Sequence, residues 1–280
     1  GTLATIGAAL NYTGTFSAGA GTQLAVTGGN LSLKGATTLT GTTVTGATGR
    51  NLGLYGATSV SGLSAGGSVV ISNYGAVTQS GGATTIGDSI AGNRAALYNS
   101  ATGVWNLVDD SGFAVGANVA SNINNVGVLE KTGGGGTSTV ANAVANSGGI
   151  VAASGVLEFQ AAVTGVGTDT ISGAATLRFD STVAAGQSVA FTGSGGSLFI
   201  GSLHNFAATI SGFDTVGAGT DDAIQLLGSW TQTGFSENQA GTLATLTLSN
   251  GSAHETLKLA GNYSANSFHF NQAGGVTTIS

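Results

Sequence analysis

The sequence is poor in charge and contains no cysteine, proline or methionine. Charged residues make up 6% of the chain, whereas a soluble domain usually has about 25%. A surface with so few charges must consist largely of Thr, Ser, Asn and small side chains, which argues against an ordinary cytoplasmic enzyme. The lack of cysteine excludes a disulfide framework and thiol chemistry, and it is compatible with an exported protein that does not depend on disulfides.

Further absences narrow the functional classes. No apolar run approaches the roughly 18 residues of a transmembrane helix, so we expect no membrane-spanning helix. Six basic and twelve acidic residues give a net charge of −6, which excludes the basic surface needed to bind nucleic acid. All acidic residues lie at or beyond Asp88, so Lys34 and Arg50 are the charged residues of 1–87. The chain starts at Gly1 without a signal peptide, which is typical of a processed or excised region.

Glycine is the residue in excess, with 50 of 280 positions. Glycine-rich chains are often disordered, because they bury too little apolar surface to offset backbone entropy. Here Gly and Pro together stay below the roughly 25–30% of disordered tracts, and Val, Leu, Ile and Phe are spread evenly along the chain. We therefore expect a folded protein that buries apolar side chains along its whole length.

A repeat of 20 to 21 residues occurs in both halves of the chain. Residues 30–37 (NLSLKGAT) recur 21 positions later as residues 51–58 (NLGLYGAT). In the second half, Leu157, Leu177 and Leu198 occupy equivalent positions 20 and 21 residues apart. Each copy has apolar residues at i and i+2, the period of a β-strand, followed by Gly, Asn or Ser at a turn. Short strands, tight corners and this period are typical of a solenoid.

The repeat predicts an all-β fold, a right-handed parallel β-helix (β-solenoid) with about 20–21 residues per coil, about 13 coils and almost no helix. Like residues would stack on like, for example Leu157 on Leu177 and Phe159 on Phe179. Stacked identical charges would repel one another, which explains the low charge. By region, we expect regular Gly/Thr-rich coils in 1–93, a less regular coil or insertion with Trp105 in 94–124, regular coils in 125–214, and C-terminal coils with a cap in 215–280.

Other β-architectures fit the pattern less well. A transmembrane β-barrel would need strands of about 9–11 residues and aromatic girdles, whereas aromatic residues make up 6% of the chain. A sandwich or a stack of antiparallel hairpins is compatible with the alternation, but the recurrence of the sequence itself favours the solenoid. A calcium-binding β-roll needs tandem nonapeptides, and residues 216–224 alone come near that pattern.

Seven segments in the last two thirds of the chain carry a family resemblance. They are residues 127–138, 146–150, 154–159, 195–198, 209–213, 257–263 and 274–279. In these segments the chain resembles the C-terminal part of large, repetitive, secreted bacterial surface proteins of the filamentous-haemagglutinin-like and autotransporter-passenger-like β-helix kind, alphaproteobacterial type. The resemblance implies export, a cell-surface location and a role in adhesion, matrix or filament building, and no reaction. One departure is Gln225, which replaces an acid of the family pattern.

Candidate chemistry in the sequence is sparse, and we expect no catalytic residues. Acidic residues such as Glu130, Asp169 and Asp180 fall on different phases of the repeat, whereas a polysaccharide-active β-helix enzyme needs an acid and a base together on one face. That enzyme is the least favoured alternative. Glu158 and Arg178 share a phase, which indicates a cross-coil ion pair. The three histidines lack metal-ligand spacing and are expected at the surface or at edges.

Calcium is the one cofactor that the sequence suggests. Asp214, Asp221 and Asp222 form the densest acidic group, and hard cations take several oxygen ligands. A solvated turn is the competing interpretation of this group.

Both ends of the chain, residues 1–7 and 274–280, are uncharged and strand-like. Free strand edges are normally protected by charge or proline, so we expect head-to-tail self-association into a filament, fibre or surface layer. The residues expected to carry it are Thr2, Leu3, Thr5, Ile6, Val276, Thr277 and Ile279. The alternative is a monomeric adhesin passenger that binds a surface polysaccharide through a lateral face with Trp105 or Trp230.

Overall fold

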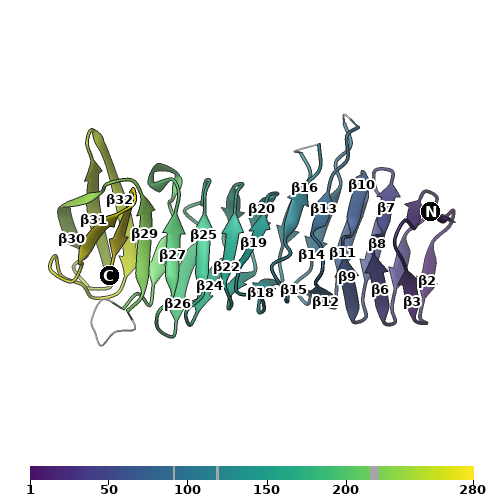
Figure 1. The fold of residues 1–280 in the computed structure, drawn as a ribbon, viewed down its shortest axis with the longest axis horizontal. Helices are drawn as coiled ribbons and strands as arrows, with labels where there is room; N and C mark the ends of the chain where they lie inside the picture. Colours follow the sequence, from purple (N-terminus) through teal and green to yellow (C-terminus); the bar gives the residue numbers. More distant parts are fainter. Residues whose placement is uncertain (91, 118–119, 215–220) are drawn as a thin grey trace.

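The protein forms a rod built of three long β-sheets. The computed structural model describes residues 1–90, 92–117, 120–214 and 221–280. These residues contain 34 short strands and a single helical turn, the 3-10 helix η1 (Leu203–Asn205). The two termini lie at opposite ends of the rod (Figure 1). The prediction of an all-β solenoid with almost no helix is confirmed.

Each regular coil contributes one strand to each of three sheets, named A, B and C. Sheet A contains, in spatial order, β1 (Leu3–Ile6), β4 (Gln23–Val26), β7 (Thr43–Gly46), β10 (Ser64–Gly67), β13 (Thr84–Ile86), β16 (Phe113–Val115), β19 (Thr137–Val140), β22 (Val156–Phe159), β25 (Thr176–Phe179), β27 (Ser197–Ile200), β29 (Ala223–Leu227), β34 (Val276–Ile279) and β33 (Phe270–Ala273). Sheet B contains β2 (Leu10–Tyr12), β5 (Leu31–Leu33), β8 (Asn51–Leu54), β11 (Val70–Asn73), β14 (Ala96–Asn99), β17 (Asn122–Asn125), β20 (Ala143–Asn146) and β23 (Val163–Gly165). Sheet C contains β3 (Phe16–Ala18), β6 (Thr37–Thr40), β9 (Thr58–Ser61), β12 (Ala76–Gln79), β15 (Val104–Leu107), β18 (Val128–Lys131), β21 (Gly149–Ala152), β24 (Thr168–Ser172), β26 (Ser188–Thr192), β28 (Thr209–Ser211), β32 (Ala253–Ala260), β31 (Leu243–Asn250) and β30 (Thr231–Glu237).

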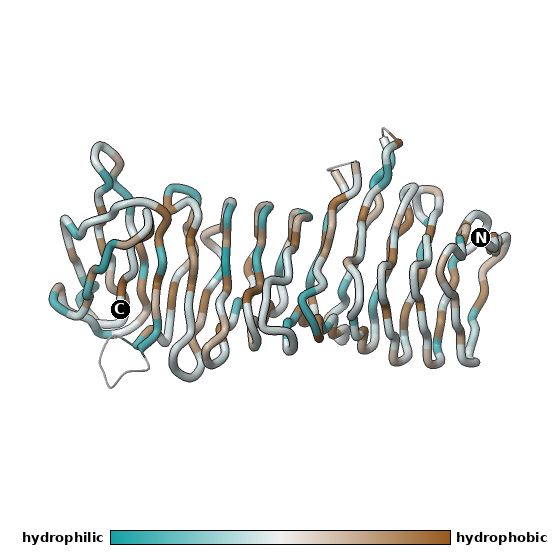
Figure 2. The backbone as a smooth tube through the Cα atoms, viewed as in Figure 1, coloured by the Kyte–Doolittle hydropathy of each residue, from teal (hydrophilic) through white to brown (hydrophobic). Residues whose placement is uncertain are grey.

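Neighbouring coils pair in parallel, so the repeat in the sequence becomes a stack in space. Leu157 pairs with Leu177, which pairs with Leu198. Phe159 pairs with Phe179, and their rings stack with centroids 5.6 Å apart. All five side chains face inward and are at most 1% exposed. The predicted stacking of like on like is confirmed, and hydrophobic residues recur from coil to coil along the rod (Figure 2).

Glycine lies where successive coils come closest. A Cβ atom on Gly35 would clash with the carbonyl oxygen of Gly14 in the preceding coil, and one on Gly56 would clash with that of Gly35. At another corner, Gly41 and Gly62 have φ angles of 55° and 61°, a conformation that glycine adopts without steric cost. The high glycine content therefore follows from close stacking and tight corners.

The coils differ in length. Asn73 pairs with Asn99 and Asn99 pairs with Asn125, each 26 residues apart, whereas the step from Asn125 to Asn146 is 21 residues. Excursions of the chain beside β13 and β16 accompany these longer coils (Figure 1). Sheet C has ten parallel strands from β3 to β28, which corresponds to about ten coils in the described residues. The expectation of about 13 coils is wrong, because some coils are longer and the C-terminal part leaves the repeat.

The C-terminal part closes the rod with antiparallel strands. In sheet A, β34 pairs with β29 and β33 pairs with β34, both antiparallel. In sheet C, β32 still pairs in parallel with β28, but β31 and β30 follow in antiparallel order. Residues 221–280 therefore combine one further parallel strand in each of sheets A and C with a cap of antiparallel hairpins.

Candidate functional site

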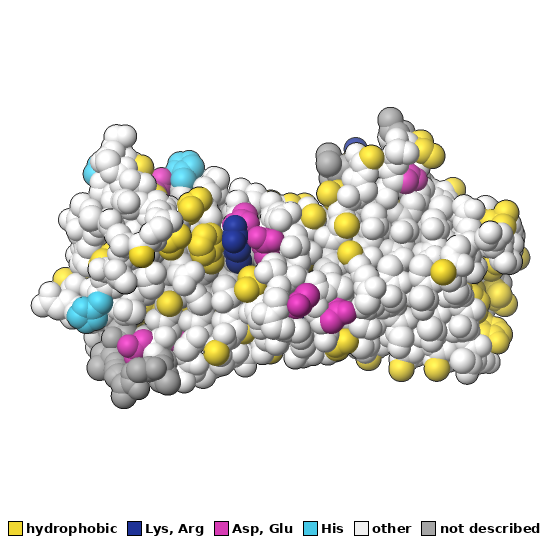
Figure 3. Space-filling model, viewed as in Figure 1, with side chains coloured by type: hydrophobic (Ala, Val, Ile, Leu, Met, Phe, Trp, Pro, Cys, Tyr) yellow, Lys and Arg dark blue, Asp and Glu magenta, His cyan; other side chains and the backbone are white. Residues whose placement is uncertain are grey.

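The N-terminal end of the rod leaves three strand edges and part of the core uncovered. Strands β1, β2 and β3 pair with β4, β5 and β6 on one side, and their other edges pair with no strand of the described residues. In β2, Leu10 and Tyr12 are in register with Leu31 and Leu33 of the next coil. Leu31 and Leu33 are at most 1% exposed, whereas Leu10 is 45% and Tyr12 39% exposed. Hydrophobic side chains gather at this end of the molecule (Figure 3).

Four residues of the predicted self-association site lie at this open end. Thr2 precedes β1, and Leu3, Thr5 and Ile6 belong to it. Ile6 packs against the core, whereas Leu3 is 61% exposed and Thr5 is also exposed. Leu3, Thr5 and Ile6 therefore lie on a strand whose outer edge pairs with no strand of the described residues, and their role in self-association stays a prediction.

The prediction missed the larger apolar residues of the same end. Leu10, Tyr12 and Phe16 come from β2 and β3 and lie above the inner column of the next coil. A signal for them exists in the sequence, because the 21-residue offset that aligns Leu31 with Leu52 also aligns Leu10 with Leu31.

The expectation of an equally open C-terminal edge is wrong. Val276, Thr277 and Ile279 lie in β34, which pairs with β29 on one side and with β33 on the other. Thr277 and Ile279 are fully buried. The Thr277 hydroxyl donates a hydrogen bond to Gly228 O at 2.8 Å and accepts one from Trp230 N at 2.8 Å. The last strand of the chain is thus an interior strand, because the chain folds back on itself.

The strands that form the C-terminal edges of sheets A and C are β33 and β30, and β30 is irregular. Its register with β31 shifts between Gln232 and Gly234, and it ends at the exposed Glu237. A bulge and a charge are both devices that keep an edge strand from pairing with another chain. Behind this edge, Trp230 and Phe268 are 6% exposed and fill the core of the cap. The C-terminal end is therefore protected where the N-terminal end is not.

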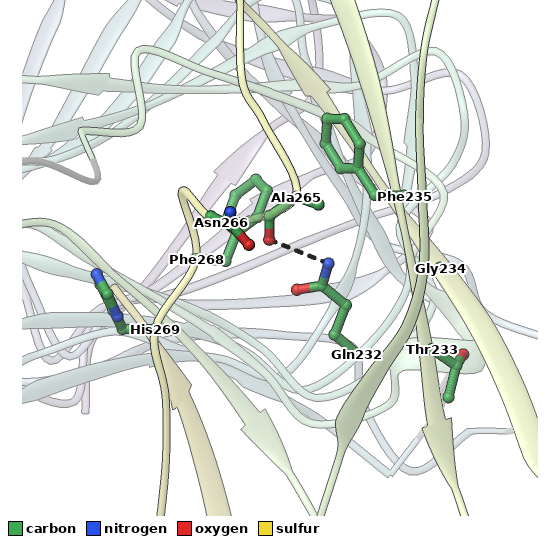
Figure 4. A pocket seen from close by; sticks show the side chains of 8 residues that line it. All are labelled: Gln232, Thr233, Gly234, Phe235, Ala265, Asn266, Phe268 and His269. Atoms are coloured by element: carbon green, nitrogen blue, oxygen red, sulfur yellow. Dashed lines mark hydrogen bonds between the residues drawn. The ribbon is translucent and has the colours of Figure 1, made fainter.

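A shallow pocket of about 730 Å³ lies in the cap, between β30 and the segment that leads to β33 (Figure 4). Its lining residues are Gln232, Thr233, Gly234, Phe235, Ala265, Asn266, Phe268 and His269. Gln232 Nε2 donates a hydrogen bond to Ala265 O at 3.2 Å. The lining provides amides, an imidazole and aromatic rings, and it includes no Asp, Glu, Lys or Arg. This set lacks a carboxylate to pair with the imidazole, so we assign it no reaction.

The side of the rod carries a small charged cluster on sheet A. Arg178 Nε lies 3.1 Å from Glu158 Oε1 and 2.9 Å from Asp180 Oδ1. Its guanidinium carbon lies 4.5 Å from the ring centroid of Phe199. The hydrogen bond to Asp180 is the main reason why the pKa of Arg178 lies above its usual value. The predicted cross-coil ion pair is confirmed, and one guanidinium holds both carboxylates, which therefore do not form a free acid–base pair.

The predicted calcium ligands do not form a metal site in the described residues. Asp222 accepts hydrogen bonds from the backbone N–H groups of Gly196 at 3.0 Å and Asp214 at 3.3 Å. Burial, with the nearby charges of Asp214 and Asp221, raises the pKa of Asp222. In the described part of the chain, no group of three or more His, Cys, Asp and Glu side chains is arranged to hold a metal ion. Residues 216–220 of the nonapeptide-like stretch lie outside the described residues.

Both tryptophans are buried, so neither ring offers the surface platform that the passenger alternative would need. Trp105 is 0% and Trp230 is 6% exposed. Trp105 Nε1 donates a hydrogen bond to Gln79 Oε1 and Trp230 Nε1 donates one to Leu227 O, both at 2.9 Å. The indoles act as core residues with satisfied N–H groups. The three histidines are exposed, as expected.

A buried lysine was not predicted. Lys131 faces inward from β18 and is fully buried. Its Nζ donates hydrogen bonds to Asp109 O, Asp110 Oδ1 and Gly133 O at distances of 2.8 to 2.9 Å. All three protons of the ammonium group are thereby satisfied, which makes its burial tolerable.

A ladder of buried asparagine side chains runs along sheet B. The Nδ2 atoms of Asn73, Asn99 and Asn125 each donate to the Oδ1 atom of the next asparagine, at 2.9, 2.8 and 2.8 Å, and the ladder ends at Asn146. The same Nδ2 atoms donate to backbone carbonyls of Val104, Val128 and Gly149. One 21-residue step of this ladder is visible in the sequence, but the two 26-residue steps conceal the rest.

The comparisons with known proteins do not assign a role. No protein-family model matches the chain, and no curated protein matches it. In the described part of the chain, no helix is long and apolar enough to cross a membrane. Functional conclusions therefore rest on the geometry described above.

Proposed function

We propose that the chain is a structural protein and not an enzyme: a rigid β-solenoid rod that joins a second copy of itself through its N-terminal end. The observation that carries this proposal is the contrast between the exposed Leu10 and Tyr12 and the buried Leu31 and Leu33 of the same columns. In a solenoid, each coil buries its inner face against its neighbours. A second copy would cover these side chains and supply hydrogen-bond partners to three free strand edges.

Charge and topology favour a second copy in a head-to-head arrangement. Residues 1–33 carry no charged side chain, so two N-terminal ends can meet without like-charge repulsion between side chains. The C-terminal end is poorly suited to pair with a strand of a second copy, because β34 is an interior strand and the edge strand β30 contains a bulge. A head-to-head contact is isologous and closes after two copies, in contrast to the open filament expected from the sequence.

Other features support a structural role outside the cell, at a bacterial surface or in an extracellular matrix. The chain has no cysteine and few charges. Its coils are stacked and self-similar, and its C-terminal two thirds resemble secreted bacterial surface proteins. On the lateral face, Glu158 and Asp180 are held by Arg178 and are not free for catalysis.

The oligomeric state of purified protein tests this proposal. We expect light scattering to give a concentration-dependent dimer, and we expect Leu10→Lys to be monomeric with an unchanged circular dichroism spectrum. Leu227→Lys is the matched control, because Leu227 is 55% exposed in β29 near the other end. This control variant should dimerise like the wild type.

Three outcomes would contradict the proposal. A wild-type protein that stays monomeric at high concentration would contradict the proposed self-association. If that monomer bound surface polysaccharide, the passenger alternative would be favoured. A growing series of oligomers, or loss of association in Leu227→Lys, would indicate head-to-tail contact.

Spin labels report the orientation of the two copies directly. Because the chain has no native cysteine, a single label can be attached at Thr5→Cys or at Ser252→Cys. Head-to-head pairs give a measurable distance for Thr5→Cys and none for Ser252→Cys.

A further inference from the structure

A carboxylate lies inside the rod at the end of the asparagine ladder. Asp169 faces inward from β24 and is fully buried. In its column it lies between Ile150 of β21 and Val189 of β26. Its Oδ1 atom accepts a hydrogen bond from Asn146 Nδ2 at 3.0 Å. Its Oδ2 atom is buried and has no hydrogen-bond partner among the described residues.

The polar groups nearest to Asp169 are neutral amides that are already engaged. Asn146 Nδ2 also donates to Gln187 Oε1 at 3.0 Å. Gln187 Nε2 donates to the carbonyl oxygens of Asn146 and Thr164, at 2.9 and 3.0 Å. Neither amide is therefore free to bind Oδ2 of Asp169.

The strands around Asp169 direct apolar side chains toward it. Besides Asp169, the inward-facing buried residues of these strands are Val144 and Asn146 of β20, Ile150 and Ala152 of β21, Leu157 and Phe159 of β22, Val163 of β23, Ile171 of β24, Leu177 and Phe179 of β25, and Val189 and Phe191 of β26. The charged residues of β22 and β25, Glu158 and Arg178, pair with each other on the outer face. Lys131, on β18, is bound to Asp110 and two carbonyl oxygens. No cation of the described residues is therefore positioned to neutralise Asp169.

We propose that Asp169 is a proton-binding site in the core of the rod, and that its ionisation destabilises the coils around it. An ionised carboxylate with one unpaired oxygen among apolar side chains is strongly disfavoured relative to its neutral form. The stability of the middle of the rod then depends on whether this single group holds a proton. The proposal concerns the core and not the ends, so it stands independently of self-association.

The direction of the pH dependence follows from the folded and unfolded states. Burial raises the pKa of Asp169 to about 7, although the hydrogen bond from Asn146 opposes the increase. In an unfolded chain an aspartate titrates near about 3.9. The stability linked to Asp169 is therefore fully present below about pH 4 and is lost as the pH rises to about 7. Across this interval the unfolding equilibrium constant increases by up to about tenfold per pH unit.

The test compares thermal midpoints of the wild type and Asp169→Asn between about pH 4 and about pH 8. The wild-type midpoint should fall as the pH rises, whereas Asp169→Asn should lose most of this slope and melt above the wild type at the alkaline end. Glu237→Gln is the matched control on the outer surface and should follow the wild type. Burial also raises the pKa of Glu130 and Asp222, so the difference between wild type and Asp169→Asn isolates Asp169.

Two further measurements keep the proposal open to refutation if the amide variant folds poorly. The Asp169→Leu variant has an apolar side chain like those of its column neighbours Ile150 and Val189. It should also remove the pH dependence of the thermal midpoint. The carboxyl carbon shift of Asp169, followed by NMR in the wild type, should titrate near about pH 7. A titration below about pH 5, or a variant that keeps the wild-type slope while melting lower at every pH, would show that Asp169 has a structural role alone.

Discussion

The two ends of the rod differ in how their strand edges and their core are covered. At either end, each sheet has an edge without a further coil, and the inner column has no layer above it. At the C-terminal end the chain turns back, β34 enters sheet A between β29 and β33, and Trp230 and Phe268 cover the core. At the N-terminal end, one edge of β1, β2 and β3 pairs with no strand of the described residues, and Leu10 and Tyr12 are exposed.

The difference shows that a solenoid must leave its repeat in order to end. A repeat presents at one end the same edge that it covers at the other, so further copies extend the rod without closing it. The cap departs from the repeat in direction and in length: β31 and β32 are antiparallel and eight residues long. The N-terminal end follows the repeat up to its edge strands, so these strands can still pair with the strands of another coil.

The largest effect is expected on the free energy of unfolding, when a buried aromatic residue at the C-terminal end is truncated. Truncation of an exposed aromatic residue at the N-terminal end should have a much smaller effect. Trp230→Ala should lower the free energy of unfolding by about 3–5 kcal/mol, because it leaves a cavity in the cap. Tyr12→Ala should cost less than about 1 kcal/mol in the monomer. Hydrogen exchange should localise the Trp230→Ala loss to β29 and β34. Equal losses for the two variants would mean that the ends are equally well packed.

A smaller effect is expected from removing the bulge that protects the C-terminal edge. Thr233 is the extra residue of the bulge, because Gln232 faces Leu248 and Gly234 faces Thr247. In a Leu10→Lys background, deletion of Thr233 should tighten self-association by at least about tenfold, about 1.4 kcal/mol, through the regularised edge of β30. Sedimentation at several concentrations measures the change. Glu237→Gln keeps the bulge and should stay close to the Leu10→Lys parent; equal gains in both variants would assign the protection to charge.

The regular coils could be predicted from the sequence, whereas the cap could not. Leu157, Leu177 and Leu198 show both the period of the coil and the face that turns inward, because strand alternation is a local property. Whether a strand then pairs in parallel or antiparallel order depends on distant segments. Thr277 and Ile279 are as uncharged and strand-like as the N-terminal edge, so the sequence alone predicts an open edge there, whereas both lie in β34, which pairs with β29 and β33.

The buried polar groups were missed for a related reason. A polar residue in a strand is normally placed on the outer face, yet Asp169 stands two residues before Ile171 and therefore shares its inward face. Lys131 shares the inward face of Leu129 in the same way. Alternation alone would have placed both side chains inside. Two of the three hydrogen bonds that make the burial of Lys131 tolerable come from a different coil, and local sequence does not reveal them.

The smallest expected effect is that of salt on the head-to-head contact. Because residues 1–33 carry no charged side chain, and because Lys34, the first charged side chain of the sequence, lies 3.0 Å above the ring of Tyr55, the dissociation constant should change less than about twofold between about 0.05 M and about 0.5 M salt. A contact through the edge strand β30 would bring the Glu237 side chains of two copies close together, and screening of their repulsion would tighten it. Sedimentation equilibrium at both salt concentrations separates the two ends. A tenfold tightening with salt would place acidic groups in the interface and would argue that the capped end is the one that associates.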